Sequence, residues 1–251
     1  MRGKIKAGPA LFVHEVGKLF GFEFRFLNLF DCHNCLAFRG APRRNDFGDQ
    51  IGLLWVINRL WLQSDTAFVM GFGGDVKLWQ DSTANREELI DAIARLKQPG
   101  WGTRFFDALY SACVDRPSGN NRGQLVHRAM VVLTDGDDTQ SIHSLGNAIA
   151  AAQRSEIQIY ALTIHPPGLA GRGDRILQRL ADATGGRLYV AASSRELGAA
   201  FAQIEQDLRT QYYVSFPPQQ ATPGYHALRI EVRPSQKLEV HARQGYYAMA
   251  E

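Results

Sequence analysis

The order of apolar and polar positions along the chain predicts a sheet covered by helices. Some short runs are apolar without alternation, which is typical of strands buried on both faces of a parallel sheet. These runs are residues 66–72, 130–133 and 157–164. Other segments repeat apolar residues at helical spacing, such as Leu89, Ile93 and Leu96. Strands that alternate with helices indicate right-handed βαβ units, and therefore an α/β fold with helices on both faces of a mostly parallel sheet.

The predicted sheet has six strands, with residues 130–133 at its centre because this run is apolar without interruption. Gly73 and Gly74 predict a hairpin, which makes residues 76–80 an antiparallel strand at the sheet edge. The first strand is expected at residues 22–30, where alternation gives way to a fully apolar run. It ends at Asp31. A strongly apolar helix is expected within residues 46–62.

The two ends of the chain differ in pattern from this α/β domain, which we assign to residues 23–209. Residues 1–22 show no clean period and are predicted to form an irregular or weakly helical lead-in. After Leu208, apolar and charged residues alternate, which predicts antiparallel strands with one solvent-exposed face. We expect residues 210–251 to form a small β extension packed on the α/β domain, because a detached sheet of this size is only marginally stable.

Composition indicates a globular protein and argues against several classes. The 251 residues are 45% apolar and 10% aromatic, enough for a sizeable core. The net charge of +3 is slight, and the densest basic cluster, Arg39, Arg43 and Arg44, has no interleaved aromatic residues, so no nucleic-acid partner is expected. No apolar run is long enough to span a membrane, and the N-terminus makes a poor signal peptide. An odd number of cysteines does not make a disulfide framework, and Cys113 lies in an apolar helical pattern typical of a core.

Polar residues at the predicted strand ends form a candidate cation site. Asp31 follows the first strand, Thr103 lies in a glycine-rich loop, and Asp135 follows the central strand before Gly136. The carboxyl ends of parallel strands meet at one sheet edge, where ligands of open α/β sheets bind. Carboxylate and hydroxyl oxygens are the ligands that Mg²⁺ prefers. The alternative is that Asp137 and Asp138 form a solvated turn and that Asp135 only caps the next helix.

Several blocks occur in an order that resembles one family. They are residues 65–72, 102–103 with 106–108, 131–139, 159–162, 180 with 184–187, and 211–213 through 245–247. In these blocks the chain resembles the von Willebrand factor type A (VWA) domain, in particular the bacterial VWFA-related proteins of acidobacterial type, which carry a C-terminal β extension. The resemblance covers residues 65–249. It implies a Rossmann-like sheet and a metal-ion-dependent adhesion site, in which a bound cation takes a carboxylate from an acidic residue of a protein partner.

The resemblance therefore implies a non-catalytic protein-interaction or adhesion module, and it favours an exported or cell-envelope protein. The sequence departs from the family at the first strand, which in the family ends in Asp-x-Ser-x-Ser. Here the candidate is residues 31–35, which place His33 and Cys35 where serines are expected. Residues 51–57 are not the first strand, because too short a segment separates them from residue 66 for a parallel crossover.

Three interpretations of this departure stay open. The adhesion site has lost its function while the fold remains, the site is altered toward a softer metal, or the reading frame is damaged near the N-terminus. With the two serines absent, Mg²⁺ is expected to bind weakly. If His33 and Cys35 point inward, Zn²⁺ should bind more tightly.

A function of another class is a thiol redox protein. Cys32 and Cys35 have Cys-x-x-Cys spacing after a predicted strand, and a helix N-terminus behind them would lower the pKa of one thiol. The order of the flanking strands is wrong for a thioredoxin fold. Hydrolase motifs are absent from the sequence: there is no Gly-x-Ser-x-Gly, and the glycines before Thr103 lack the lysine of a phosphate-binding loop. His143 is interpreted as a surface or capping residue.

Overall fold

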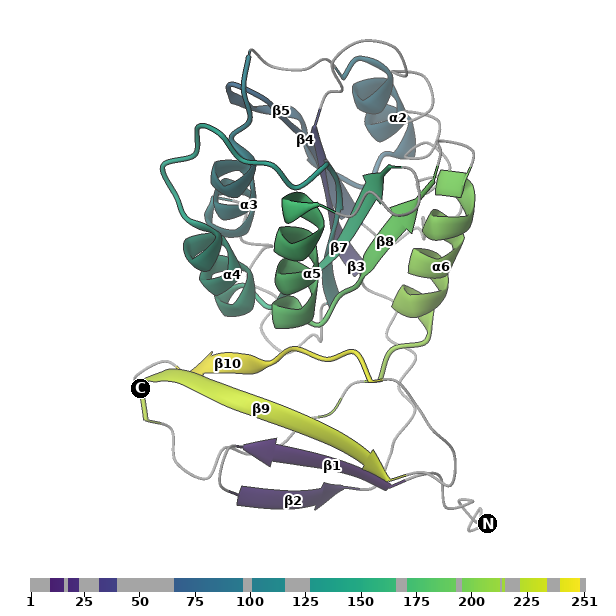
Figure 1. The fold of residues 1–251 in the computed structure, drawn as a ribbon. Helices are drawn as coiled ribbons and strands as arrows, with labels where there is room; N and C mark the ends of the chain where they lie inside the picture. Colours follow the sequence, from purple (N-terminus) through teal and green to yellow (C-terminus); the bar gives the residue numbers. More distant parts are fainter. Residues whose placement is uncertain are drawn as a thin grey trace, which may run out of the picture.

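The structure is a computed structural model, and its description covers most of the α/β part of the chain and much of the two ends. The described residues are 10–15, 18–22, 32–39, 66–96, 101–115, 127–165, 171–192, 196–212, 214, 222–233 and 240–248. Within them lie two separate sheets and five helices. The larger sheet carries the helices, and the smaller one lies at one end of it (Figure 1).

The larger sheet has six strands in the order β5-β4-β3-β6-β7-β8, which confirms the predicted α/β fold class. The strands are β3 (Cys32–Arg39), β4 (Thr66–Phe72), β5 (Val76–Thr83), β6 (His127–Leu133), β7 (Ile157–Ile164) and β8 (Leu188–Ala191). β5 pairs antiparallel with β4 at the sheet edge, as the glycine hairpin predicts, and the other neighbours are parallel. β6 lies between β3 and β7, so the predicted interior position of this strand is also confirmed.

Helices cover both faces of this sheet. They are α2 (Arg86–Ala94), α3 (Phe105–Val114), α4 (Leu145–Arg154), α5 (Arg172–Thr184) and α6 (Leu197–Arg209). α2 and α6 pack on one face, and α3, α4 and α5 pack on the other (Figure 1). In β6 the odd-numbered Val131 joins the first core and the even-numbered Met130 and Val132 join the second. Because successive strand residues point to opposite faces, a run buried on both sides must be apolar at every position.

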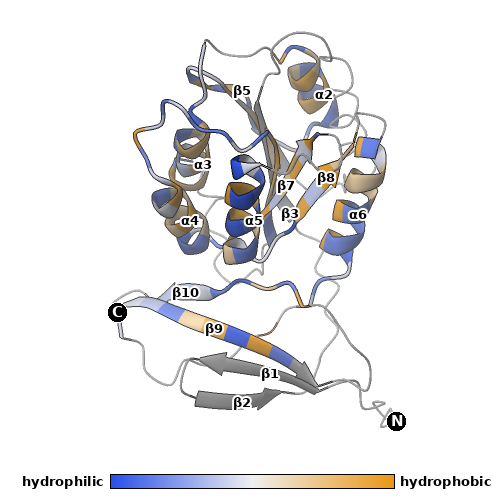
Figure 2. Ribbon diagram, viewed as in Figure 1, coloured by the Kyte–Doolittle hydropathy of each residue, from blue (hydrophilic) through white to orange (hydrophobic). Residues whose placement is uncertain are grey.

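The smaller sheet is antiparallel, with the order β10-β9-β1-β2. Its strands are β1 (Ala10–Glu15), β2 (Lys18–Phe22), β9 (Gly224–Arg233) and β10 (Gly245–Ala248). In β9 hydrophilic and hydrophobic residues alternate along the strand, as expected for a sheet with one wet face (Figure 2). The prediction of an irregular or weakly helical lead-in is therefore wrong for β1 and β2. β1 pairs with β9, which is far along the chain. Such a pairing produces no local pattern in the sequence of β1 from which the strand could be predicted.

The first strand of the larger sheet also differs from the prediction. β3 spans Cys32–Arg39 and pairs with both β4 and β6, whereas the strand was expected at residues 22–30. Of that expected run, Phe22 ends β2, and residues 23–31 lie outside the described residues, as does the helix expected within 46–62. Neighbouring short apolar runs have similar strand propensity, so pairing with β4 and β6 determines which run becomes the strand.

The smaller sheet contacts the larger one at the edge where the parallel strands begin. Arg243 forms an isolated bridge with Thr184 and an ion pair of 3.0 Å with Glu156, just before β7. The backbone N–H of Gln244 donates to the carbonyl of Ala183 at 3.4 Å. The carboxyl edge, where the candidate cation site was predicted, is at the opposite end of the sheet. The domain boundaries at residues 22 and 209 remain a prediction.

Within the described part of the chain, no helix has both the length and the apolar character needed to cross a bilayer.

Candidate functional site at the carboxyl edge

Loops from separate parts of the chain meet at the carboxyl edge of the larger sheet: residues 73–75 between β4 and β5, residues 101–104 before α3, and residues 134–144 between β6 and α4. The N–H of Arg104 donates to the carbonyl of Gly73 at 2.7 Å. The N–H of Thr103 donates to Oγ1 of Thr139 at 2.9 Å. In return, the Thr103 carbonyl accepts from the N–H groups of Thr139 and Gln140, each at 3.0 Å. Backbone hydrogen bonds therefore hold the loop of Thr103 against the loop that carries Asp135.

The Thr103 hydroxyl is the clearest sign of a ligand position in these loops. The residue is only 1% exposed, and its Oγ1 has no hydrogen-bond partner within the described structure. A buried polar atom without a partner costs free energy, and an ion that the atom would coordinate is one explanation for it. Asp135 is exposed on the neighbouring loop, where its Oδ1 accepts from the N–H of Asp137 at 3.1 Å. These two oxygen donors fit a hard cation such as Mg²⁺ but supply only part of its octahedral shell.

The structure does not bring His33 and Cys35 to this edge. Cys32 and His33 pair with His127 and Arg128 at the start of β6, and Cys35 pairs with Met130. At about 3.3 Å per strand residue, His33 lies roughly 20 Å along the sheet from the level of Asp135. Placing His33 and Cys35 with Asp135 was therefore wrong, because these residues lie at the start of β3 and not after the end of a strand. Asp31 lies outside the described residues, and no cluster of three His, Cys, Asp or Glu suited to a metal occurs among those described.

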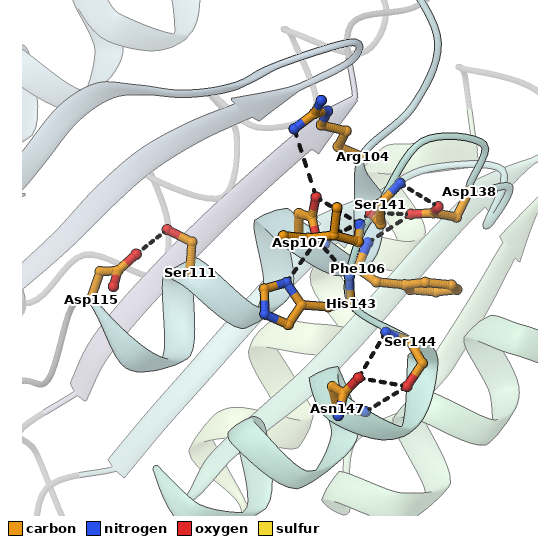
Figure 3. Close-up of polar contacts among 11 residues, drawn as sticks. Arg104, Phe106, Asp107, Ser111, Asp115, Asp138, Ser141, His143, Ser144 and Asn147 are labelled. Atoms are coloured by element: carbon orange, nitrogen blue, oxygen red, sulfur yellow. Dashed lines mark hydrogen bonds and ion pairs between the residues drawn. The ribbon is translucent and has the colours of Figure 1, made fainter.

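Two further carboxylates organise the loop at 134–144, and the sequence did not identify them (Figure 3). Asp138 accepts from the N–H of Phe106 at 2.9 Å and from the hydroxyl of Ser141 at 2.6 Å. Asp107, in the first turn of α3, accepts from the N–H of Ile142 at 3.1 Å and from that of His143 at 2.9 Å. Each carboxylate thus satisfies donors on the element opposite, and together they lock the loop to the start of α3.

His143 also contacts Asp107 and stacks on α3, so it is more than a surface or capping residue. Its Nδ1 lies 2.8 Å from Oδ1 of Asp107, and its ring stacks on Tyr110 at 3.9 Å between centroids. Burial raises the pKa of Asp107, but the backbone and side-chain hydrogen bonds of His143, the N–H of Ile142 and the charge of His143 together lower it below the ordinary value. An acidic residue in the first turn of a helix was the available sequence signal.

The thiol redox alternative is not supported. Cys32 and Cys35 lie within β3, in the interior of the sheet order, and not at the N-terminus of a helix that would lower a thiol pKa. Cys113 is a buried core residue of α3, as predicted, and burial raises its pKa to about 12. A thiol with so high a pKa is not a nucleophile near neutral pH.

Comparison with known proteins identifies the family of this fold. A model of the von Willebrand factor type A domain matches residues 62–203. A search of curated proteins found no match to the chain. Among solved structures, BatB from Bacteroides thetaiotaomicron is 16% identical with a TM-score of 0.56, over 70% of this chain and 98% of that protein.

Two other solved structures share the fold at similarly low identity. A von Willebrand factor type A protein from Catenulispora acidiphila is 16% identical with a TM-score of 0.55, over 79% of this chain and 46% of that one. Proximal thread matrix protein 1 from the mussel byssus is 12% identical with a TM-score of 0.57, over 81% of this chain and 47% of that one. The family match spans more than half of the chain, and the sheet order and helix layers agree with it. The chain belongs to the von Willebrand factor type A domain family.

Proposed function

We propose that this chain is a non-catalytic protein-interaction module of the VWA type with a degenerate metal-ion-dependent adhesion site. The contact surface is the carboxyl edge formed by the loops at 73–75, 101–104 and 134–144. The unpartnered buried hydroxyl of Thr103, hydrogen-bonded through its backbone to the loop of Asp135, is the observation that carries this proposal. The described part of the β extension contacts the opposite edge of the sheet, which supports a partner site at the carboxyl edge.

Thr103 and Asp135 are the residues that would hold a divalent cation at this edge. When bound, the cation would supply positive charge that can accept a carboxylate from an acidic residue of a protein partner. Two protein oxygens leave most of an octahedral shell to water, so Mg²⁺ affinity is expected to be weak. Zn²⁺ binding through His33 and Cys35 is not part of this proposal, because the register of β3 places them away from the edge.

Calorimetric titration with Mg²⁺ tests the cation site. We expect a Kd on the order of 1 mM or weaker, abolished in both Asp135→Ala and Thr103→Val. Thr103→Val removes a hydroxyl that makes no hydrogen bond to the described residues, so the variant should fold with little or no loss of thermal stability. Asp137→Ala is the matched control, because it removes an exposed carboxylate from the same loop without touching a proposed ligand.

The outcomes separate the interpretations of the site. Binding well below millimolar Kd that vanishes in Asp135→Ala would contradict a degenerate site. Weak binding with a Kd of about 1 mM or above, or no binding at all, would support a degenerate site. No binding at all would leave the chain as an interaction scaffold with a vestigial site. A pull-down from the envelope fraction of the source organism, with and without EDTA, then shows whether partner capture depends on a cation.

A further inference from the structure

We propose that the carboxyl edge binds its protein partner without a cation. Two exposed apolar side chains, Trp101 and Ile142, anchor the partner. The partner segment carries apolar side chains beside a basic one. The proposal rests on the proposed function, because it assumes that this edge is the contact surface. Trp101 is 87% exposed and Ile142 is 83% exposed, the highest fractions among the large apolar side chains that the structure describes. Each lies on a loop that flanks the Thr103 hydroxyl.

A single exposed apolar side chain is ordinary, but these two lie on loops that are hydrogen-bonded to each other at Thr103. Trp101 is two residues from Thr103, and Ile142 lies on the loop whose Thr139 bonds to Thr103. The other exposed apolar side chains of the described residues are not part of these loops: Val114 at the end of α3, Val190 in β8, Tyr212 after α6, Tyr225 in β9 and Val240 before β10. Tryptophan is also one of the residue types enriched among side chains that dominate binding energy.

The backbone of both anchors is held in place, although their side chains are exposed. The chain at Trp101 packs so closely on Gly74 that a Cβ there would lie 2.9 Å from the Trp101 nitrogen. The next residue, Gly102, packs against the side chain of Gln140, two residues before Ile142. The N–H of Ile142 donates to both carboxylate oxygens of Asp107, at 3.1 and 3.2 Å. Anchors on a fixed backbone lose little freedom on binding, which favours affinity.

The charge of the same loops indicates a basic partner. Asp75, Asp135 and Asp137 are all exposed on them. The cationic side chain in the described loops is Arg104, whose guanidinium lies 4.0 Å from Asp107. Two exposed cations lie beside these loops, Lys77 in β5 and Arg172 at the start of α5. Among the described residues of the three loops themselves, the exposed carboxylates outnumber the one cation. Without a divalent ion, such a surface repels an acidic segment and attracts lysine or arginine.

Selection from a phage-displayed random peptide library on the purified full chain tests the proposal. In EDTA we expect enriched peptides with apolar or aromatic residues next to lysine or arginine. Affinity of a synthetic consensus peptide should fall roughly tenfold or more in the double variant Trp101→Ala/Ile142→Ala. The matched control is Val190→Ala/Tyr212→Ala, which removes one aromatic and one aliphatic exposed side chain from elsewhere and should leave affinity unchanged. Because all these side chains are exposed, both double variants should keep the wild-type melting temperature within a few degrees.

A parallel selection in Mg²⁺ separates this inference from the proposed function. Peptides that bind the Trp101→Ala/Ile142→Ala variant as well as the wild type would overturn the inference. Acidic peptides enriched only in Mg²⁺, and lost with Asp135→Ala, would overturn it while supporting the cation-dependent adhesion site. Failure to enrich peptides in either buffer would count against both proposals.

Discussion

Asp107 shows how one side chain can organise a functional loop. Its carboxylate is 11% exposed and accepts hydrogen bonds from successive N–H groups of the loop at 134–144. Those N–H groups precede α4 and have no strand or helix partner of their own, so a carboxylate is the group that satisfies them. The position of Ile142, and with it the surface that we propose for binding, therefore depends on a residue that touches no ligand.

Replacing Asp107 with asparagine should destabilise the fold by about 1–3 kcal/mol, because an amide nitrogen would face N–H donors that the carboxylate now satisfies. Urea unfolding of the wild type and of Asp107→Asn measures the difference. Asp91→Asn, an exposed substitution on α2, is the control and should change stability by less than about 0.5 kcal/mol. Equal unfolding free energies for wild type and Asp107→Asn would refute this role.

The same variant gives a test in acid. The pKa of Asp107 is lowered from its ordinary value of 3.8, so the folded state favours the ionised carboxylate. Its contribution is fully present above 3.8 and is lost as the pH falls through the lower pKa of the folded state. The stability difference between wild type and Asp107→Asn should therefore persist down to pH 3.8 and shrink only below it.

At the scale of the element, α5 illustrates how a helix end positions a neighbouring segment. The sequence predicts that this helix stops at Gly185 and Gly186, and the structure confirms a C-cap at Gly185 with φ of 81° in the left-handed region. A Cβ on Gly185 would also lie 2.5 Å from the nitrogen of Arg243, in the segment that leads to β10. One glycine therefore serves both the helix cap and the docking of the β extension.

Gly185→Ala should destabilise the protein by about 1–2 kcal/mol or more, because alanine is strained at positive φ and its methyl group meets the Arg243 backbone. Gly198→Ala in α6 is the matched control. There the added methyl group meets no atom within 4 Å. It should be neutral or stabilise the helix by up to about 1 kcal/mol. Thermal unfolding followed by circular dichroism measures both, and the same melting temperature for the two variants would rule out the structural role of Gly185.

At the scale of the whole molecule, side chains at the amino edge join the two sheets. The guanidinium of Arg154 lies 4.4 Å from the ring centre of Tyr247 in β10. Arg187 lies 2.7 Å from His241, and Arg243 pairs with Glu156. These contacts support the expectation that the β extension packs on the VWA domain. The two edges of the larger sheet therefore differ in role: the β extension contacts the amino edge, and the proposed binding surface lies at the carboxyl edge.

We expect the two parts to stay together after the chain is cut between them. After limited trypsin cleavage near Arg209, the fragments should co-elute on size exclusion and separate only in denaturant. In the double variant Arg243→Ala/Tyr247→Ala, which removes the ion pair with Glu156 and the stacking with Arg154, the fragments should separate more readily. Release of a soluble fragment from the cleaved wild-type chain would show that the extension does not pack on the domain.

Local pattern in the sequence was sufficient for much of this fold. Apolar residues without alternation identified β6 as a strand buried on both faces, and paired glycines identified the β4–β5 hairpin. The cap at Gly185 was predictable for the same reason, since only glycine accepts positive φ at little cost. In each case the structure is determined by neighbours within one turn, one hairpin or one strand, and the sequence therefore carries the full signal.

Only the tertiary structure decided which segments pair and which side chains remain exposed. The pairing of β1 with β9 and the register of β3 depend on partners far along the chain. Local periodicity therefore could not predict β1, nor could it predict that His33 lies at the start of β3 and far from the carboxyl edge. The exposure of Trp101 and the hydrogen bond from the Ile142 N–H to the Asp107 carboxylate likewise arise where separate loops meet. A one-dimensional pattern states how apolar a residue is, but burial and hydrogen bonding depend on what the fold places beside it.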